Sequence, residues 1–418
     1  MNKQSRKEPE PSRVVFEGLE EFARQEIQRR LQELLDEELT DFLGRGKSRR
    51  CIEVDKPKVY RNGHGKPRKL TISAGTIELQ RPRLRGDAQL EERFRSRLLP
   101  LFVKRTKQVD ELIPELYLHG LAEGDFDKAL RGLLGDDAPI SAKTVSRLKE
   151  KWLTEREEWA SRPLNQADIV YMWVDGVYVK AGLEKSKAAL LVVLGAHVDG
   201  HKEILALKPG HRESTEGWSE VLRDLKARGL SCPRLVIGDG HLGIWAALQN
   251  VFPEAEEQRC WNHRIVNVLD KVPKKNQPQA RLLLRAMPYA DTVENAQSLR
   301  NKFHAWCEKK GCKEAGELLE HDWERMVAFY SFPKEHWQHI RTTNPIESPF
   351  AALRLRTDAA KRYKRVDNAT AVIWKMLMVV QSNFRRLKSP ELLLEVYVGE
   401  KYVNGEKKKK GESRENAA

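Results

Sequence analysis

The feature that most constrains the fold is a run of uncharged, mostly apolar residues at 188–197, AALLVVLGAH. It is far shorter than the roughly 20 residues that a helix needs to cross a bilayer. A strand that reads as a continuous apolar run is typically buried on both faces, so we expect a sheet that is covered on both sides. Further strand patterns occur at 169–180, 204–207, 235–238 and 258–261, with helical patterns at 217–227 and 242–248. Together they predict a mixed α/β sheet that begins with a meander.

The rest of the chain is mainly helical in pattern. At 418 residues the chain suggests two to four domains. Apolar residues recur at helical spacing over 16–39, and Gly44 fits the end of that helix. The expected parts are a disordered tail at 1–13, a helix at 14–44, a basic strand-forming region at 45–90, a helical DNA-binding region at 91–164, an α/β core at 165–263 and 341–390, an all-α insertion at 264–340, and a basic tail at 391–418.

Basic residues are concentrated in two zones of the chain. Lys and Arg number 75 against 61 Asp and Glu, a net charge of +14. Residues 45–85 hold 13 basic and 3 acidic residues, and residues 341–388 hold 11 and 3. The zones indicate a polyanion such as DNA that is held at two places, although a solvated surface would have the same composition.

The chain carries no sign of secretion. The first 13 residues lack an apolar segment, so they do not resemble a signal peptide. Five cysteines, an odd number, argue against a disulfide framework and for a reducing compartment. We therefore expect a cytoplasmic protein with no membrane partner, associated with the nucleoid when it is bound to DNA.

Three short helical patterns precede the α/β core. The first covers 109–119 and is followed by Gly120, and the second covers 126–134 and is followed by Gly135. The third could begin after Ser141 as its cap and continues through Trp152. Such a series is typical of a helix-turn-helix, and an ordinary helical bundle is the alternative. In the first case the DNA contacts are expected from the third helix, at Lys143, Arg147 and Lys149.

Three acidic residues are candidates for catalysis, and each has a structural alternative. Asp175 precedes Gly176, a favoured hairpin-turn pair. Asp239 could cap the helix that follows it. Glu347 follows Asn344 and Pro345, an arrangement that suits a capping box.

The catalytic interpretation of the acids is chemically coherent. Three carboxylates without histidine suit Mg²⁺, and two such ions can promote phosphoryl transfer on DNA. We expect Asp175 and Asp239 to bridge the metals and Glu347 to hold the second one, with Mn²⁺ as a possible substitute. The sequence contains no Walker loop, nucleotide-binding glycine motif or nucleophile elbow.

Two other groups of residues are candidates for a function. Cys260 and His263, with Cys307 and Cys312 further on, have spacings that do not support a closed zinc site, so we expect no structural zinc. A long basic helical stretch is expected at about 350–388. The basic side chains of this helix could form a solvated surface, or they could contact DNA phosphates. The residues expected to make those contacts are Arg354, Arg356, Lys361 and Arg362.

Several blocks, in order along most of the chain, resemble the mutator-type transposases of bacterial insertion sequences. They include the strand-forming region 60–86, the helical stretches 115–126 and 133–152, the first acidic strand 169–180, the second-aspartate block 235–274, and the glutamate block 336–357. The block at 235–274 is the most similar and contains the family's Cys-x2-His signature, here Cys260 and His263.

The resemblance implies an α/β catalytic core of ribonuclease-H-like type with an all-α insertion, preceded by a mainly helical DNA-binding region. It carries the acidic triad onto Asp175, Asp239 and Glu347, with the signature pair nearby. It also implies binding to the element's terminal inverted repeats and to target DNA, Mg²⁺-dependent strand cleavage, and 3′-OH strand transfer. We expect a homodimer or higher oligomer on DNA.

The sequence leaves two points open. Pro349 suits a helix that begins with Ser348 as its cap, which would leave Glu347 just before the helix; the other possibility is a helix that begins near Pro345. The alternatives in function are a non-catalytic DNA-binding regulator derived from a transposase, and a structure-selective nuclease on the same core.

Overall fold

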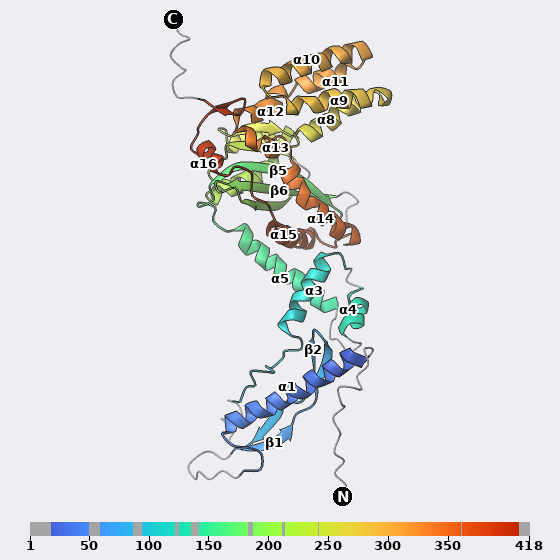
Figure 1. Cartoon of the computed structure of the whole chain (residues 1–418), viewed down its shortest axis with the longest axis vertical. Coiled ribbons are helices and arrows are strands. Elements are labelled where there is room, and N and C mark those ends of the chain that lie inside the picture. Colours follow the sequence, from blue (N-terminus) through green and yellow to red (C-terminus); the bar gives the residue numbers. More distant parts are fainter. Residues whose placement is uncertain are drawn as a thin grey trace. The chain divides into compact units, whose positions relative to one another are not determined.

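The chain divides into two compact units, residues 1–148 and residues 149–418 (Figure 1). The expected disordered tail at 1–13, Gly135, Ser141 and Lys361 lie outside the residues that the structure describes. This computed structural model describes residues 18–49, 59–86, 94–121, 125–134, 142–182, 187–210, 214–240, 242–360 and 362–408.

The first unit packs one long helix on a strand hairpin. Helix α1 (Leu19–Leu43) ends at Gly44 in the left-handed conformation, as predicted. Strands β2 (Arg68–Ile72) and β3 (Gly75–Leu79) form the hairpin, and β1 (Tyr60–His64) pairs with β4 (Pro82–Arg85). The core contains Leu35 of α1 together with Leu70, Ile72, Ile77, Leu79 and Leu99.

The three helices predicted before the core are present. They are α3 (Lys107–Leu118), α4 (Phe126–Leu134) and α5 (Ala142–Ala160), and the boundary between the two units falls within α5. Residues 122–124 and 135–141, which connect the helices, lie outside the described part of the chain. The helix-turn-helix therefore remains a prediction.

The second unit is built on a five-stranded mixed sheet, as predicted. The order is β7-β6-β5-β8-β9, in which β5, β6 and β7 form an antiparallel meander and β8 and β9 add parallel to β5. The strands are β5 (Ile169–Val179), β6 (Ala188–His197), β7 (Lys202–Gly210), β8 (Leu235–Gly238) and β9 (Glu256–Arg259).

Helices bury the sheet because its strands are apolar on both faces. Strand β6 is buried along almost its whole length. Helices α6 (Thr215–Ala227) and α7 (Leu242–Val251) contribute to one continuous apolar core with the strands. Helices α14 (Asn344–Ala360) and α15 (Val366–Gln381) pack against β5 and β7, respectively.

Side chains satisfy the outward backbone groups of the edge strand β7. The Ile204 nitrogen donates to Gln381 Oε1 at 2.7 Å. Arginine side chains donate to three carbonyl oxygens of the strand: Arg162 to Ile204 at 2.8 Å, Arg228 to Leu205 at 2.9 Å, and Arg156 to Leu207 at 3.2 Å. Buried backbone polar groups require such partners, so this edge is closed by side chains.

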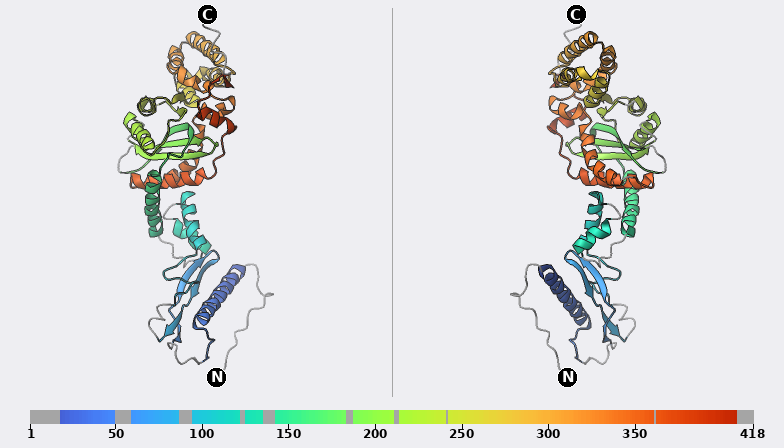
Figure 2. Two further views of the ribbon diagram at one scale, coloured as in Figure 1. Left: turned by 90° about the vertical axis from the view of Figure 1, so that its left-hand side faces the viewer. Right: turned by 90° about the vertical axis from the view of Figure 1, so that its right-hand side faces the viewer.

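The predicted all-α insertion covers the other edge of the sheet, at β9. The Gln258 side chain donates to the Met326 carbonyl at 3.2 Å and accepts from the Phe329 nitrogen at 2.8 Å. Figures 1 and 2 show the insertion, yellow to orange, on the opposite side of the sheet from α14 and α15. Its helices are α8 (Trp261–Asp270), α9 (Gln277–Ala286), α10 (Val293–Lys310), α11 (Lys313–Glu320), α12 (Trp323–Val327) and α13 (Trp337–Ile340).

The C-terminal region differs from its prediction in two ways. The stretch at 350–388 is not one basic helix, because the chain breaks after α14 and α15 buries apolar residues such as Val372 and Ile373. The expected basic tail also contains structure up to residue 408, with a helix α16 (Glu391–Tyr397) and a hairpin of β10 (Tyr402–Val403) and β11 (Glu406–Lys407). Leu393 and Val396 are buried, and this apolar spacing explains the helix. Among the described residues, no helix is both long and apolar enough to cross a membrane.

Candidate functional site

Two of the predicted acidic residues follow equivalent positions on neighbouring parallel strands. In the β5–β8 ladder, Trp173 pairs with Ile237. Asp175 lies two residues after Trp173, and Asp239 lies two residues after Ile237. Neighbouring strands lie about 4.8 Å apart, and residues in register point to the same face. Asp175 therefore lies within β5, on the strand that neighbours β8, and Asp239 lies directly after the end of β8.

The hairpin-turn alternative for Asp175 does not describe the fold. Asp175 is not in a hairpin turn, because β5 continues through it and Asp175 pairs with Val192 of β6. Its carboxylate accepts a hydrogen bond from the Gly176 nitrogen at 2.7 Å. Asp239 lies between β8 and α7, and it is three residues before the first residue of that helix. Both side chains are partly exposed and accessible to a ligand.

Glu347 lies in the first turn of α14, which packs against β5. The nitrogens of Ile346 and Glu347 both donate to the Thr343 carbonyl, at 3.0 Å, so the helix begins directly after Thr343. The possibility that Ser348 caps the helix was therefore wrong. Pro349 lies inside α14, where it has no N–H to donate to the Pro345 carbonyl, so the helix lacks one backbone bond near its start.

A cluster of polar side chains surrounds Glu347. Thr343 Oγ1 donates to Glu347 Oε1 and lies 3.1 Å from Cys260 Sγ and 3.4 Å from His263 Nδ1. The Thr343 nitrogen also donates to Cys260 Sγ at 3.3 Å. His263 Nδ1 is 3.8 Å from Glu347 Oε1. Cys260, His263 and Glu347 thus form one group of possible metal ligands. Among the described residues, Cys307 and Cys312 are not part of this group.

The surroundings of His263 are negative. A hydrogen bond with Cys260 is the main cause that raises the pKa of His263 to about 9, against the opposing effect of burial. The charges of Cys260, Glu347 and Asp239 act in the same direction.

Sequence reasoning missed Thr343, which contacts three members of this cluster. The only signal was its position next to Asn344, the start of the glutamate helix. Because partners of a metal ligand orient that ligand, Thr343 is placed to fix the Glu347 carboxylate. Asp175, Asp239 and Glu347 are all partly exposed carboxylates, the type of ligand that a hard divalent cation such as Mg²⁺ prefers.

The predicted DNA contacts have different environments. Arg147 is exposed and Lys149 is half-buried, while the Lys143 side chain lies outside the described residues. Arg354 is exposed, whereas Arg356 is only 2% exposed, so burial argues against the predicted contact between Arg356 and a DNA phosphate. Arg362 is exposed and donates to the Gly182 carbonyl at 2.9 Å.

A second group of possible metal ligands lies elsewhere on the sheet and was also missed. His197, His201 and Glu203 each offer a ligand atom, and these atoms lie within 4.8 Å of one another. The signal in the sequence was the pattern His-x3-His-x-Glu around a short turn between two strands.

Comparison with known proteins gives consistent matches. The family model described as "Transposase, Mutator family" matches residues 3–386. The chain is 40% identical over 297 residues to the transposase for insertion sequence element IS6120 of Mycolicibacterium smegmatis, covering 71% of this chain and 92% of that protein. It is 37% identical over 280 residues to the transposase for IST2 of Acidithiobacillus ferrooxidans, covering 66% and 94%. With the transposase for IS256 in transposon Tn4001 of Staphylococcus aureus the identity is 24% over 378 residues, covering 90% and 91%.

Proposed function

Because this chain belongs to the Mutator family of transposases, we propose that it binds the terminal inverted repeats of its own insertion sequence, cleaves DNA strands there, and joins the freed 3′-OH to target DNA. The observation that carries the proposal is the convergence of Asp175 and Asp239 on neighbouring strands, with α14 supplying Glu347 against β5. The order of the five strands and the late acidic helix support a ribonuclease-H-like core.

The three carboxylates would hold divalent metal ions, with Mg²⁺ as the expected metal and Mn²⁺ as a possible substitute. Such ions supply Lewis-acid stabilisation of charge on the reacting phosphate. The ligands would be Asp175 in β5, Asp239 directly after β8, and Glu347 on α14. The Thr343 hydroxyl fixes the orientation of Glu347. No protein side chain is needed as a covalent nucleophile, because water and then the DNA 3′-OH attack the phosphate.

The proposal is tested by cleavage of an end-labelled duplex that carries one end of the element, with a random duplex of equal length as the control. We expect cleavage at the element end in Mg²⁺ and none after chelation with EDTA. Binding without cleavage under any divalent metal would favour a DNA-binding regulator. Cleavage of branched DNA with no preference for the terminal sequence would favour a structure-selective nuclease.

Arg354 provides a test of how DNA is held beside the acids. It is seven residues after Glu347 on one continuous helix, so the two residues share a face of α14. We expect Arg354→Ala to lower single-turnover cleavage at saturating protein by about tenfold, and to flatten the log–log salt dependence of binding by about 0.9 if one phosphate contact is lost. Because phosphate contacts carry no base information, affinity should fall equally for terminal and random duplexes.

The matched variant Arg354→Lys keeps the charge at this position and should recover most of the cleavage. Normal cleavage by Arg354→Ala, combined with a selective loss of terminal-repeat recognition, would instead mean that this helix reads sequence.

Thr343 provides a test of how Glu347 is positioned. Thr343→Val removes the hydroxyl group and nearly preserves the shape, so the Glu347 carboxylate loses its neighbouring donor. Loss of such a partner typically costs 10- to 100-fold in metal affinity or activity. We expect the Mg²⁺ concentration for half-maximal cleavage to rise by about that factor, and Thr343→Ser to restore it. An unchanged Mg²⁺ dependence in Thr343→Val would contradict the proposal that the Thr343 hydroxyl positions Glu347.

A further inference from the structure

The turn between β6 and β7 gathers two imidazoles and one carboxylate on one face of a hairpin. The His197 nitrogen donates to the His201 carbonyl at 2.9 Å, and the Gly200 nitrogen donates to the His197 carbonyl at 2.9 Å. His197 and His201 therefore face each other across the turn, and Glu203 is two residues further along β7, on the same face as His201. The backbone of the hairpin fixes this arrangement.

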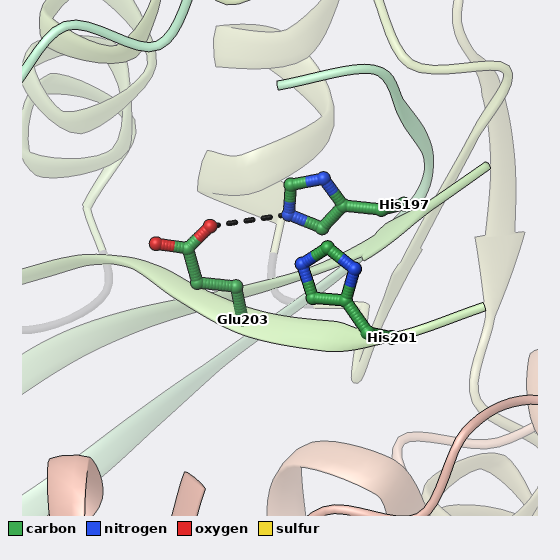
Figure 3. A group of neighbouring side chains, drawn as sticks. All are labelled: His197, His201 and Glu203. Carbon is green, nitrogen blue, oxygen red and sulfur yellow. Dashed lines mark hydrogen bonds and ion pairs between the residues drawn. The ribbon is translucent and has the colours of Figure 1, made fainter. Parts of the chain in front are cut away.

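The side chains already contact one another. His197 Nε2 lies 3.1 Å from Glu203 Oε2, and the two imidazole rings are stacked with their centroids 3.7 Å apart. Figure 3 shows both rings beside the Glu203 carboxylate, with the His197–Glu203 bond dashed. The ligand atoms of all three residues lie within 4.8 Å of one another, so small side-chain rotations would bring them to a common centre.

The surrounding charged groups are arranged as partners of these ligands. Asp199 Oδ1 lies 2.5 Å from His201 Nδ1, which leaves His201 Nε2 for another ligand. A carboxylate on the second ring nitrogen is the usual outer partner of a metal-bound histidine. Arg162 donates to Glu203 Oε1 at 2.7 Å, so Oε2 is the oxygen that faces His197. Burial opposes ionisation, but the bonds from His197 and Arg162 prevail and lower the pKa of Glu203 to about 2.

We propose that His197, His201 and Glu203 form a binding site for one divalent transition-metal ion of the zinc class, separate from the acidic triad. Two imidazole nitrogens and one carboxylate suit Zn²⁺ and disfavour Mg²⁺, which prefers an all-oxygen set. Binding requires the stacked rings to tilt from their 18° interplanar angle so that both Nε2 atoms point at one ion. The ion would take the place of the direct contact between His197 Nε2 and Glu203 Oε2.

The site is accessible and remote from the acidic triad. His197 and Glu203 line a cavity of about 480 Å³ that also contains Arg162, Asn165 and Gln166, and this cavity provides a path for the ion and for a water ligand. His197 pairs with Ile169 at the start of β5, whereas Asp175 pairs with Val192. Six residues of strand place the two sites about 20 Å apart.

The ion would stabilise the attachment of the C-terminal segment to the sheet. The Leu387 nitrogen donates to the Gly200 carbonyl at 2.9 Å, and Arg386 lies 3.8 Å from Asp199. Gly200 also lies so close to Pro390 that a Cβ on Gly200 would be 2.9 Å from Pro390 Cβ. A metal that fixes the turn therefore fixes the surface on which residues 386–390 pack.

The test uses the full chain, stripped of metal by a chelator and then given Zn²⁺ in the presence of excess Mg²⁺. We expect one equivalent of Zn²⁺ to remain after gel filtration, measured by mass spectrometry of the metal, and the Tm to rise with Zn²⁺ concentration. His201→Asn, at an exposed position, should lose the retained equivalent and the rise in Tm. Glu203→Gln should weaken retention at least tenfold. His304→Ala, which changes a half-buried histidine of α10, is the control and should behave as the wild type.

Cobalt substitution separates this site from the Cys260–His263 pair. Co²⁺ bound through imidazole and carboxylate shows only weak visible bands, whereas bound thiolate adds an intense near-ultraviolet charge-transfer band. We expect no thiolate band in the wild type and unchanged retention in Cys260→Ser. Failure of the wild type to retain Zn²⁺, equal retention by His201→Asn, or a thiolate band that Cys260→Ser abolishes would each overturn the proposal.

Discussion

Asp175→Asn, Asp239→Asn and Glu347→Gln are each expected to reduce cleavage of the element end by about a thousandfold or more, while DNA binding is largely retained. Each substitution keeps the size of the side chain and much of its hydrogen bonding, but it removes a charge that would hold the metal. The metal-dependent contribution to such reactions is several kcal/mol, and each 1.36 kcal/mol corresponds to a factor of ten in rate. Single-turnover cleavage and salt-titrated binding of the same duplex are the two measurements.

The conservative substitutions also separate catalysis from the structural roles of these acids. Asn functions well in turns and helix caps, so a merely structural Asp239 would tolerate it. Asp168→Asn is a suitable control, because Asp168 lies in the same unit, outside the proposed site, and accepts a hydrogen bond from Tyr397. Wild-type cleavage rates in the three variants at matched Mg²⁺ would contradict the assignment of the triad.

Asp322→Asn is expected to lower the unfolding free energy of the second unit by about 3–5 kcal/mol, the usual cost of breaking a buried ion pair. The Asp322 side chain is 3% exposed and lies 2.8 Å from Arg264 Nη2, whose side chain is 2% exposed. Arg259 also pairs with Asp322. Asparagine would leave both guanidinium groups buried without a counter-charge. Urea unfolding followed by tryptophan fluorescence measures this unit alone, because all ten tryptophans lie within residues 149–418.

The expected effect of Asp322→Asn depends on pH. Burial opposes ionisation of Asp322, but the charges of Arg259 and Arg264 prevail and lower its pKa. A carboxylate with a lowered pKa contributes stability above its unfolded value of about 3.9, and this stability is lost as the pH falls through the folded value. The difference between wild type and variant should therefore stay constant from neutral pH down to about pH 5, and shrink as the pH falls below the unfolded value of about 3.9. Glu324→Gln changes an exposed neighbour and should have little effect at either pH.

The same substitution should also affect the acidic site. Arg259 immediately precedes Cys260, and its side chain lies against Gly240, which follows Asp239. Gly240 has φ +96°, so the loop that carries Asp239 adopts a backbone conformation that favours glycine. When Arg259 loses its partner Asp322, this loop loses the support on one side. Reduced cleavage by Asp322→Asn at temperatures where the chain remains folded is the corresponding observation.

Local patterns predicted most of the sheet and the helices around it. The apolar run at 188–197 is the buried strand β6, and the glycines at 44 and 75 mark the end of α1 and the turn of the β2–β3 hairpin. These features depend on neighbours in sequence, so they can be read from one segment at a time. The C-terminal hairpin was missed because strands β10 and β11 have only two residues each, too few to show a period.

The details of the site depend on contacts between distant segments. The positions of Asp175 and Asp239 relative to one another depend on the register of β5 against β8, which no local pattern specifies. Thr343 meets Cys260 across 83 residues of sequence. Arg354 and Arg356 are alike in sequence, yet one is exposed and the other buried, because the orientation of α14 on the sheet decides which face contacts solvent.

The closure of both sheet edges limits how copies of this protein could assemble. The outer strand β7 has its backbone groups occupied by Gln381 and by three arginines, and the helical insertion occupies the side of β9. An incoming strand from a second copy would find no continuous row of donors and acceptors with which to pair. We therefore expect that two copies of this chain would not merge their sheets into one. Any contact between copies would use helices, loops or the N-terminal unit, and each copy would keep its own sheet intact.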